Sequence, residues 1–435
     1  MNASFDTVFA PSSAIGGAIA VIRVSGPLTR EIADRILDRT VTNRPGRLVH
    51  TRVKRGAQTV DDCMAVFFQS PKSYTGEDML ELHCHGGMQT VRAVQDVLSE
   101  AGGVPAAPGE FTKRAFLAGK MDLSQAEAVM DVINAQADSS LLSALEQLGG
   151  SVSRRIRAVE DTLLDARSAI EAAIDYPDEA EADAYAALPR VLDAAKAELS
   201  TLIEEGRRAR VLRDGLRVAI IGRPNVGKSS LLNALLGEDR AIVTAAAGTT
   251  RDVLDERLSI AGVPVRLIDT AGVREASDEA ERIGVDRAKQ ALESADVVLL
   301  VLDGSMDKTA EDEALLSETA GKTRIIVANK CDLGTRIDGA LLISCKTGEG
   351  LENLKARIAA LAEPSLQSTA AITNERHIDA LVRALEAVTH AETQTDPDCI
   401  ATDLSDALHR LGTITGTDVD AEVIDRIFSN FCVGK

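Results

Sequence analysis

Residues 222–229 combine glycine, lysine and serine at a spacing suited to holding a polyphosphate. They read Gly-Arg-Pro-Asn-Val-Gly-Lys-Ser and directly follow an apolar, β-branched run. Glycines let a backbone wrap an anion with its N–H groups pointing inward, and the helix that follows adds its positive end. Lys228 is placed to reach the β- and γ-phosphates, and the Ser229 hydroxyl is placed to bind Mg²⁺. Leucines at helical spacing over 231–236 favour this phosphate loop over an ordinary glycine turn.

Two later segments could complete a magnesium and γ-phosphate site. Thr249 and Thr250 lie in the run Gly-Thr-Thr-Arg-Asp, where a threonine can complete the Mg²⁺ shell only when a γ-phosphate is present. Asp269 ends a strand-like run and opens the sequence Asp-Thr-Ala-Gly. It can hold Mg²⁺ through water, and Gly272 can donate its N–H to the γ-phosphate. These segments predict a switch that responds to the γ-phosphate.

Asn329, Lys330 and Asp332 form an N-K-x-D motif at the end of another strand-like run. The Asp332 carboxylate can accept both the N1–H and the N2–H of guanine, a pair of donors that adenine does not offer. The loop expected to back the base comprises Ser344, Cys345 and Lys346. Four motifs in this order and spacing predict a domain that binds and hydrolyses GTP.

The residue after Asp-Thr-Ala-Gly is Val273, where small GTPases carry a glutamine that orients the attacking water. The water must therefore be positioned otherwise, and carboxylates between Glu275 and Glu281 are candidates. No arginine finger is apparent in the sequence. Asn225 could help to bind a monovalent cation against the phosphates, which would do the charge work of an arginine.

The 435-residue chain is too long for one ordinary core, which predicts two or three domains. A net charge of −19 excludes non-specific coating of nucleic acid, so any RNA contact needs a local basic patch or a partner. The six scattered cysteines include no C-x-x-C pair, which argues against a disulfide framework or a zinc ribbon. No cation precedes Arg23 and no apolar run is long enough to span a membrane, so we expect a cytoplasmic protein without a secretory leader.

Residues 1–118 are expected to form an α/β domain, with strands near 18–24 and 62–68. Residues 39–60 carry a basic stripe without any acid, which indicates either a solvated hairpin or a surface for RNA or a partner. His83 and His85 alternate as metal ligands on one strand face would, but no third ligand stands at metal spacing. We therefore favour a strand that ends at the Gly-Gly pair 86–87, and His83-Cys84-His85 has no assigned role.

The remaining segments read as helical. Ser124 and Glu127 resemble a capping box, and the acidic run 175–183 is expected to be a solvated loop between two helices. Amphipathic helices are also expected over 375–388 and 400–411. The terminus carries two aromatic residues, which predicts that it docks, with Cys432 as either a buried anchor or a reactive thiol near a site.

End to end, the chain resembles the tRNA modification GTPase MnmE (TrmE) family. The specific segments are PGEFTKRAFLAGKMDLSQAEA from residue 108 and the terminal FCVGK, supported by TGEDMLELHCHGG from residue 75 and by the GTPase motifs. The resemblance implies an α/β multidomain protein. Its parts would be an N-terminal folate-binding and dimerisation domain (1–118), a helical domain in two parts (119–210 and 371–435), and an inserted Ras-like P-loop GTPase domain with a doubly wound sheet (211–370).

The resemblance also implies an activity. With a flavin-containing (FAD) partner of the MnmG type, the family adds an aminomethyl or carboxymethylaminomethyl group to C5 of the wobble uridine in certain tRNAs. A 5-formyl- or methylene-tetrahydrofolate would supply the one-carbon unit. The two G domains of a homodimer would pair across the GTP face, with potassium replacing an arginine finger.

Site residues are likewise implied by the resemblance. Folate contacts correspond to Arg23, Glu81, Lys120 and Lys435, and catalytic roles fall on Lys228, on Glu281 as the water-orienting acid, and on Cys432. Potassium corresponds to Asn225, Thr244, Ala246 and Thr249, and magnesium to Ser229 and Thr250. The expected GTP contacts are Asn225, Val226, Gly227, Lys228, Ser229, Ser230, Thr244, Ala245, Ala246, Ala247, Gly248, Thr249, Thr250, Asp269, Thr270, Ala271, Gly272, Asn329, Lys330, Asp332, Ser344, Cys345 and Lys346.

Some positions depart from the family pattern. Cys345 stands where alanine is commoner, and Ala245 and Ala246 replace bulkier or acidic residues in the potassium loop. The alternative function is a regulatory GTPase of ribosome assembly without modification chemistry. That class would predict an RNA-binding module after residue 370, such as an I-G-x-x-G loop, and the sequence has none there. A further alternative makes the N-terminal domain a pure dimerisation module.

Overall fold

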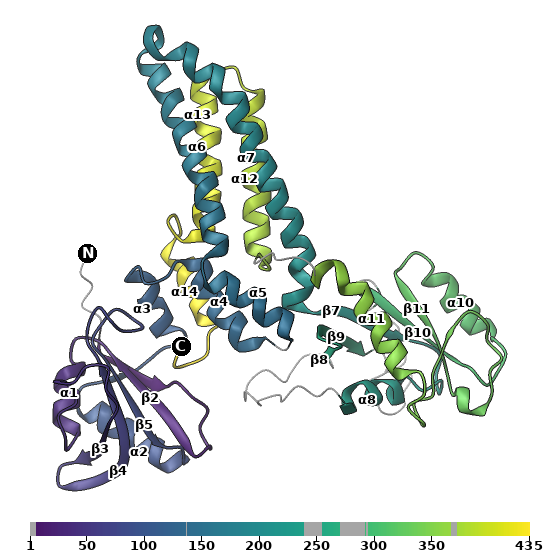
Figure 1. The fold of residues 1–435 in the computed structure, drawn as a ribbon, viewed down its shortest axis with the longest axis horizontal. Helices are drawn as coiled ribbons and strands as arrows, with labels where there is room; N and C mark the ends of the chain where they lie inside the picture. The colour runs from purple at the N-terminus through teal and green to yellow at the C-terminus, as the bar shows by residue number, and fades with distance from the viewer. Residues whose placement is uncertain (1–5, 136, 239–254, 270–291, 293–294, 367–371) are drawn as a thin grey trace. The chain divides into compact units, whose positions relative to one another are not determined.

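The structure is a computed structural model that describes residues 6–135, 137–238, 255–269, 292, 295–366 and 372–435. Its contacts group the chain into two compact units, whose elements are labelled in Figure 1. Unit 1 comprises Met1–Met130 and Gly412–Lys435, and unit 2 comprises Asp131–Leu411. The two ends of the chain therefore share one unit. The finer four-part division made from the sequence stays a prediction.

Unit 1 contains a six-stranded sheet of order β3-β4-β5-β2-β1-β6, antiparallel except where β1 pairs with β6. Its strands are β1 (Val8–Pro11), β2 (Ile19–Ser25), β3 (Val49–Arg55), β4 (Gln58–Phe68), β5 (Met79–His85) and β6 (Val104–Pro105). Successive side chains of a strand point to opposite faces, so Ala20, Ile22 and Val24 are buried together on the inner face. Helices α1 (Thr29–Ile36) and α2 (Met88–Glu100) supply the rest of this inner core.

The outer face of this sheet carries rows of residues that cross three strands. Two neighbouring rows are Arg23–Glu81–Val66 and Ser25–Met79–Phe68. Residues of one row share a face because β2, β5 and β4 are paired in register. Helix α3 (Glu110–Leu117) begins beside this sheet, where Phe111 packs on Val8.

The C-terminal segment packs within unit 1. Phe428 of α14 (Ala421–Ser429) and Phe431 are buried beside Leu123 of α4 (Leu123–Asn134), and the two phenylalanine rings lie 5.0 Å apart. Gly434 has a φ of +94°, and a Cβ at this position would collide with the carbonyl oxygen of Pro11. The expected docking of the terminus is confirmed.

The start of α4 differs from the expectation. Asp122 Oδ1 accepts hydrogen bonds from Gln125 N (3.0 Å) and Ser124 Oγ (2.9 Å), and Gln125 Oε1 accepts one from Asp122 N (3.0 Å). The reciprocal pair is therefore Asp122 with Gln125, and the capping box expected at Ser124 and Glu127 is wrong. Aspartate caps a helix as well as serine does, and α4 begins directly after Asp122.

Unit 2 contains a set of long helices and a second sheet. The helices are α5 (Asp138–Leu148), α6 (Ser151–Asp175), α7 (Pro177–Asp214), α12 (Glu375–Thr393) and α13 (Pro397–Thr415). Helix α7 packs on both α6 and α12. The helices expected over 375–388 and 400–411 are confirmed. None of the helices in the described ranges is long and apolar enough to cross a membrane.

The loop expected over the acidic run 175–183 is wrong. Only Tyr176 separates α6 from α7, and the rest of the run belongs to these two helices. Pro177 suits the first helical position, where its missing N–H costs nothing. Acidic residues are favourable in the first turn because the helix N-terminus carries a partial positive charge.

The second sheet has the order β12-β11-β10-β7-β9-β8, and every pair is parallel except β8 with β9. Its strands are β7 (Leu216–Ile221), β8 (Asp255–Ile260), β9 (Val263–Asp269), β10 (Val297–Asp303), β11 (Arg324–Asn329) and β12 (Leu341–Leu342). The short helix η1 (Cys331–Leu333) follows β11, and the longer helices are α8 (Lys228–Glu238), α10 (Ala310–Glu318) and α11 (Leu351–Leu366). The expected doubly wound sheet is confirmed.

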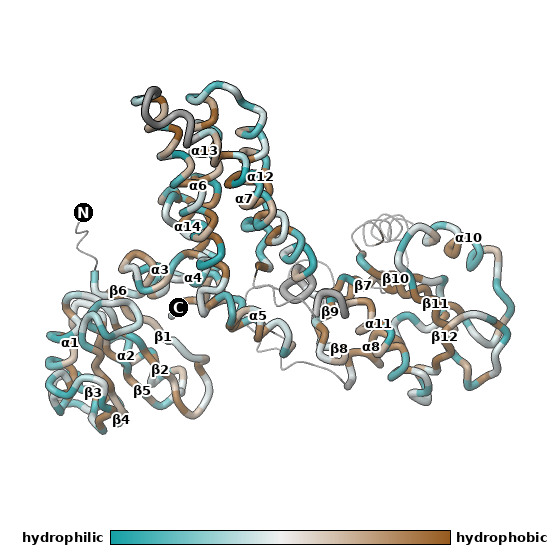
Figure 2. Tube along the Cα trace, turned by 45° about the horizontal axis from the view of Figure 1, so that its top comes forward, coloured by the Kyte–Doolittle hydropathy of each residue, from teal (hydrophilic) through white to brown (hydrophobic). Residues whose placement is uncertain are grey.

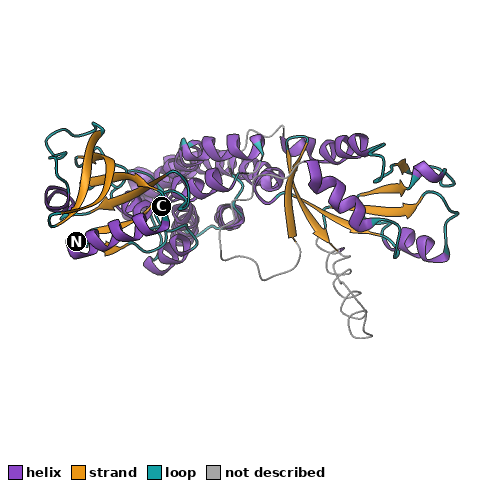
Figure 3. Cartoon of the chain, turned by 90° about the horizontal axis from the view of Figure 1, so that it is seen from below, coloured by secondary structure: helices purple, strands orange, loops and turns teal. Residues whose placement is uncertain are grey.

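Both faces of this second sheet are covered. Figure 3 shows the strands between helices, and Figure 2 shows hydrophobic residues concentrated along β10 and β11. Every residue of β10 is buried, and its alternate side chains belong to two separate apolar clusters. Near-continuous apolar runs are typical of parallel strands that are covered on both faces.

We expect Phe428→Ala to release the docked terminus. The ring is 1% exposed, so its loss should cost about 3–5 kcal/mol of local stability. Amides of α14 should then exchange at least about a hundredfold faster in hydrogen–deuterium exchange measured on the full chain. Val433→Ala is the control, because Val433 is 53% exposed. Unchanged exchange in the Phe428 variant would contradict the buried anchor.

Candidate functional site

The phosphate loop follows β7, which lies between β9 and β10 in the second sheet. Chain connections reverse direction at this point, and ligands of doubly wound sheets bind outside the carboxyl ends of the strands there. Asn225 has a φ of +66° and Gly227 a φ of +101°, so the loop is tightly curved. Ser229 and Ser230 stand exposed in the first turn of α8. The loop therefore has the position and the curvature that a polyphosphate site needs.

The lysine of the loop is held across it. Lys228 Nζ donates to the carbonyl oxygens of Gly222 (2.7 Å) and Arg223 (2.9 Å). These bonds hold the ammonium group over the concave side of the loop, where phosphate oxygens can replace the carbonyls as its partners. Arg223 itself lies 3.3 Å from Asp312 Oδ2 at the start of α10, so this arginine is committed to an ion pair.

One buried amide joins the phosphate loop to the guanine motif. Asn329 Nδ2 donates to the carbonyl of Val226 (2.9 Å), and Asn329 Oδ1 accepts from the backbone N–H of Cys345 (3.1 Å). A Cβ on Gly227 would collide with Asn329 Nδ2. One side chain therefore fixes the phosphate loop, the N-K-x-D motif and the segment at Cys345 to each other.

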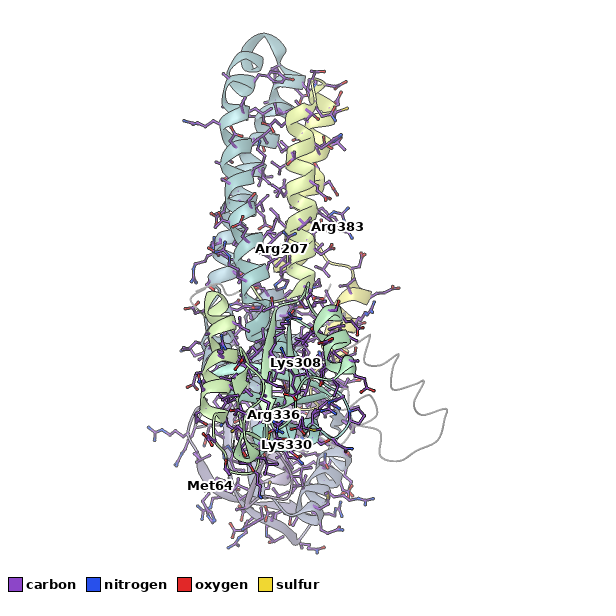
Figure 4. All side chains as sticks on the ribbon, turned by 90° about the vertical axis from the view of Figure 1, so that its right-hand side faces the viewer. Met64, Arg207, Lys308, Lys330, Arg336 and Arg383 are labelled. Carbon is purple, nitrogen blue, oxygen red and sulfur yellow. The ribbon has the colours of Figure 1, made fainter. Side chains whose placement is uncertain are left out.

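The base side of the site is also preordered. Asp332 Oδ1 accepts a hydrogen bond from Ser344 Oγ (2.7 Å), which orients the carboxylate. Lys330, labelled in Figure 4, has a φ of +67° and pairs with Asp303 at 2.6 Å. Burial alone would raise the pKa of Asp303, but hydrogen bonds from Lys330 and Ser305 outweigh it and hold the pKa below its ordinary value. Asp303 therefore stays ionised and keeps Lys330 in place.

Cys345 occupies the position where alanine is commoner in the family. The residue is partly buried, and burial raises the pKa of its thiol to about 11. A neutral thiol is small and apolar, so it can pack at this position as alanine would. The neighbouring Lys346 is exposed.

Much of the switch side of the site lies outside the described residues. Asp269 is described only through its backbone, which pairs with Ile220 just before the phosphate loop. The structure thus places the end of β9 beside the end of β7. Predicted site residues outside the described ranges are Thr244, Ala245, Ala246, Ala247, Gly248, Thr249, Thr250, Thr270, Ala271, Gly272 and Glu281.

A second constellation lies in unit 1. Arg23 donates to Glu81 Oε1 from Nε (3.1 Å) and from Nη2 (2.9 Å), and the two side chains are 14% and 17% exposed. The guanidinium carbon of Arg23 lies 5.0 Å from the ring centre of Tyr74 and 5.6 Å from that of Phe111. Burial raises the pKa of Tyr74, although Thr112 and Arg23 both oppose this shift. An arginine ordered in this way can present its remaining N–H groups to a planar or anionic ligand.

The C-terminal residues reach this constellation through the backbone of α3. Phe111 N–H donates to the carbonyl of Lys435 (3.2 Å), and Gly109 N–H donates to the carbonyl of Cys432 (3.4 Å). The Cys432 side chain is exposed, so the alternative of a buried anchor is wrong. Lys120 Nζ donates to the carbonyl of Pro71 (2.9 Å).

Sequence reasoning missed three members of this neighbourhood. Tyr74 and Phe111 stack on Arg23, and both belong to the rare aromatic residues, which make up 3% of the chain. Arg114 is 4% exposed and pairs with Glu77 (3.1 Å) and Glu110 (2.9 Å). Phe111 and Arg114 stand in the segment from residue 108, but nothing in their spacing indicated which elements they contact.

The histidine run of β5 has separate local contacts. Cys84 is buried in the inner core, while His83 Nε2 lies 3.9 Å from Glu81. His85 Nδ1 lies 2.7 Å from Asp61, and this hydrogen bond raises the pKa of His85. In the part of the chain that the structure describes, no group of three or more His, Cys, Asp and Glu residues could hold a metal ion. The strand ends before Gly86 as expected.

The sheet order, the phosphate loop and the guanine motif define a Ras-like P-loop GTP-binding fold, carried in one chain with an α/β module. Family models match as well: the MnmE helical domain over residues 123–432 and the GTP-binding protein TrmE N-terminus over residues 7–120. The chain therefore belongs to the MnmE family of tRNA modification GTPases. Fold class and family are thus as the sequence predicted.

Curated relatives agree over nearly the whole chain. The tRNA modification GTPase MnmE of Listeria innocua is 41% identical, covering 99% of this chain and 100% of the relative. The protein of the same name from Lactiplantibacillus plantarum is 42% identical, covering 99% of each. Among solved structures, the G domain of the T. maritima FeoB iron transporter is 31% identical, covers 33% of this chain and 97% of that chain, and has a TM-score of 0.26.

We expect Gly227→Ala to reduce GTP affinity at least about a hundredfold. The added Cβ would displace Asn329 and would occupy a backbone conformation that alanine rarely adopts. Isothermal titration with GTP measures the effect. Gly237→Ala is the matched control, because a Cβ there meets open space on α8. Equal affinity in the two variants would contradict the role of the Asn329 link.

Proposed function

We propose that this protein binds and hydrolyses GTP as part of a reaction that modifies the wobble uridine of certain tRNAs. The single observation that carries the GTP part is the Asn329 link, because it holds the phosphate loop and the guanine motif at one end of one sheet. Membership of the MnmE family supports the tRNA part. The protein is expected to act in the cytoplasm.

The roles within the G domain follow from chemistry. Lys228 neutralises the β- and γ-phosphates, Ser229 and Thr250 bind Mg²⁺, and Asp332 selects guanine. Glu281 orients the attacking water in place of the missing glutamine. The described residues suit a bound nucleotide and Mg²⁺, because the Lys228 ammonium already lies over the loop and Ser229 is exposed in the first turn of α8.

Potassium completes the charge stabilisation in this proposal. Asn225 contributes a ligand from the phosphate loop, and the other ligands are Thr244, Ala246 and Thr249. The arginine of the phosphate loop cannot serve as an arginine finger, because Arg223 is paired with Asp312. This pairing supports a role for a cation in stabilising the transition-state charge. Two G domains of a homodimer pair across the bound nucleotide, and the cation then replaces an arginine.

Folate binds in unit 1 in this proposal. Arg23 and Glu81 form the centre of the site, with Lys120 and Lys435 at its border. The ordered guanidinium and its two aromatic neighbours support this assignment, since a pterin ring offers both hydrogen-bonding edges and a flat face. A 5-formyl- or methylene-tetrahydrofolate supplies the one-carbon unit there.

The modification step needs a partner. A flavin-containing partner of the MnmG type carries FAD, and Cys432 acts on the substrate from the C-terminal tail. Exposure of the Cys432 side chain supports this role, because a reactive thiol must be reachable. The alternative of a regulatory GTPase of ribosome assembly is not favoured, since the nearly full-length relatives carry the MnmE name.

We expect GTP turnover to be stimulated strongly by potassium relative to sodium at equal ionic strength. Asn225→Ala should lose most of this stimulation, because it removes one cation ligand. Steady-state phosphate release from the purified chain measures both rates. Asn233→Ala on α8 controls for the loss of an amide elsewhere in the domain. Equal rates in the two salts would contradict the potassium site and would leave the GTP site standing.

We expect Cys432→Ser to abolish tRNA modification while GTP hydrolysis stays within about twofold of the unchanged protein. The thiol lies in unit 1, whereas the nucleotide site lies in unit 2. Mass spectrometry of wobble nucleosides and phosphate release measure the two activities. Cys399→Ser is the control, since Cys399 is also exposed but stands on α13. Normal levels of modified uridine in the Cys432 variant would overturn the role of the thiol.

A further inference from the structure

A cavity of about 470 Å³ opens in unit 1 between two loops that the proposed function does not use. Pro45 and Gly46 of one loop and Pro71 and Lys72 of the other line it, with Phe68 at the end of β4. Gly46 N–H donates to the carbonyl of Phe67 (2.8 Å), which fixes the first loop against the sheet. The volume lies within the range of small-molecule sites.

The charge around this cavity is opposite to that of the chain. Residues 39–60 and 69–76 contain no acid, although the chain as a whole carries a net charge of −19. Arg44, Arg47 and Lys72 are exposed cations of these two loops, and none of the three has an ion pair among the described residues. Lys72 lines the cavity, and Arg44 and Arg47 are the chain neighbours of the lining residues Pro45 and Gly46. The nearby Asp78 carboxylate accepts from the Ser70 N–H (2.8 Å) and lies 3.7 Å from Arg30, so it already has its own partners.

Part of the basic stripe behaves differently. Arg52 lies 3.4 Å from Asp62, and Arg55 lies 3.1 Å from Glu100 of α2. These cations of the β3–β4 hairpin are neutralised by neighbouring acids. Among the described residues, Arg39 and Lys54 of the stripe also have no ion pair, and Lys54 Nζ donates only to the Thr59 hydroxyl (2.9 Å). Arg44 and Arg47 are the two unpaired cations of the stripe that stand next to the lining residues Pro45 and Gly46 in the chain.

The cavity is adjacent to the Arg23–Glu81 pair. Phe68 belongs to the row Ser25–Met79–Phe68, which neighbours the row that contains Arg23 and Glu81. Arg23 and Phe68 are separated by two strand spacings and two residues along the strand, which puts their Cα atoms about 12 Å apart. The loop that carries Lys72 also carries Tyr74, which stacks on Arg23, and Lys120 donates to Pro71 of the cavity lining.

We propose that this cavity binds the poly-γ-glutamyl tail of folate, a chain that carries one carboxylate for each added glutamate. The inference rests on the folate part of the proposed function and names the form of folate that the site prefers. Each carboxylate gains a cation among Arg44, Arg47 and Lys72, while the apolar floor of Phe68 and the two prolines packs on the methylene groups of the tail. A monoglutamate brings only its own two carboxylates to the cavity and therefore gains less there than a polyglutamate does.

The test compares 5-formyl-tetrahydrofolate with its pentaglutamate by isothermal titration of the full chain. The pentaglutamate should bind about tenfold more tightly, and the ratio of the two affinities should fall to about one in the double variant Arg44→Gln/Arg47→Gln. Lys72→Gln, measured separately, should lower the ratio in part. Arg55→Gln is the matched control from the same stripe and should keep the full ratio, because Arg55 is paired with acids of α2.

The possible failures are distinguishable. Equal affinities of the two compounds for the unchanged protein would overturn the tail site and leave the folate site standing. No binding of either compound would overturn the folate part of the proposed function and the tail site with it. An equal loss in the Arg55 variant, or a loss of tRNA affinity with an unchanged folate ratio, would overturn the proposal in favour of general electrostatics or an RNA surface.

Discussion

The return of the C-terminus to the N-terminal unit is the constraint on which the rest of the structure depends. Two backbone hydrogen bonds connect the last four residues to the start of α3, and Phe428 and Phe431 bury their rings beside α4. Gly434 passes so close to Pro11 that no side chain could replace its hydrogen. Everything between residues 131 and 411 must therefore leave unit 1 and come back to it.

The two proposed sites use the same physical device. In each, a side chain that is far from its partner in the sequence is immobilised before any ligand arrives. Asn329 links the phosphate loop to the loop at Cys345, and Arg23 is held by Glu81 and stacked on two rings. Preordering lowers the entropy that ligand binding must overcome. The two proposed sites lie in different units of the chain.

The cations of unit 1 differ in whether an acidic side chain pairs with them. Arg114 is buried, pairs with Glu77 and Glu110, and donates to the carbonyl of Ser25 in β2 (3.4 Å), so it anchors α3 to the sheet. Arg52 and Arg55 are exposed but paired, and such surface pairs contribute little to stability. The cations at the cavity have no such partners. In a chain with a net charge of −19, loops that carry only cations attract anionic ligands locally.

The sequence by itself determined the nucleotide site, because the phosphate loop and the N-K-x-D motif are local: a few consecutive residues set the backbone curvature and the chemistry together. It also determined the helices and strands whose apolar spacing was regular. It misplaced the cap of α4 and the loop at 175–183, where neighbouring residues compete for the same role and only packing selects one. Tertiary structure alone decided that Arg23 meets Glu81, Tyr74 and Phe111, and that the terminus lies beside α3. The partners of Arg23 stand 51 to 88 positions from it in the sequence, and the terminus stands more than 300 positions from α3. No local pattern encodes which of such distant elements meet.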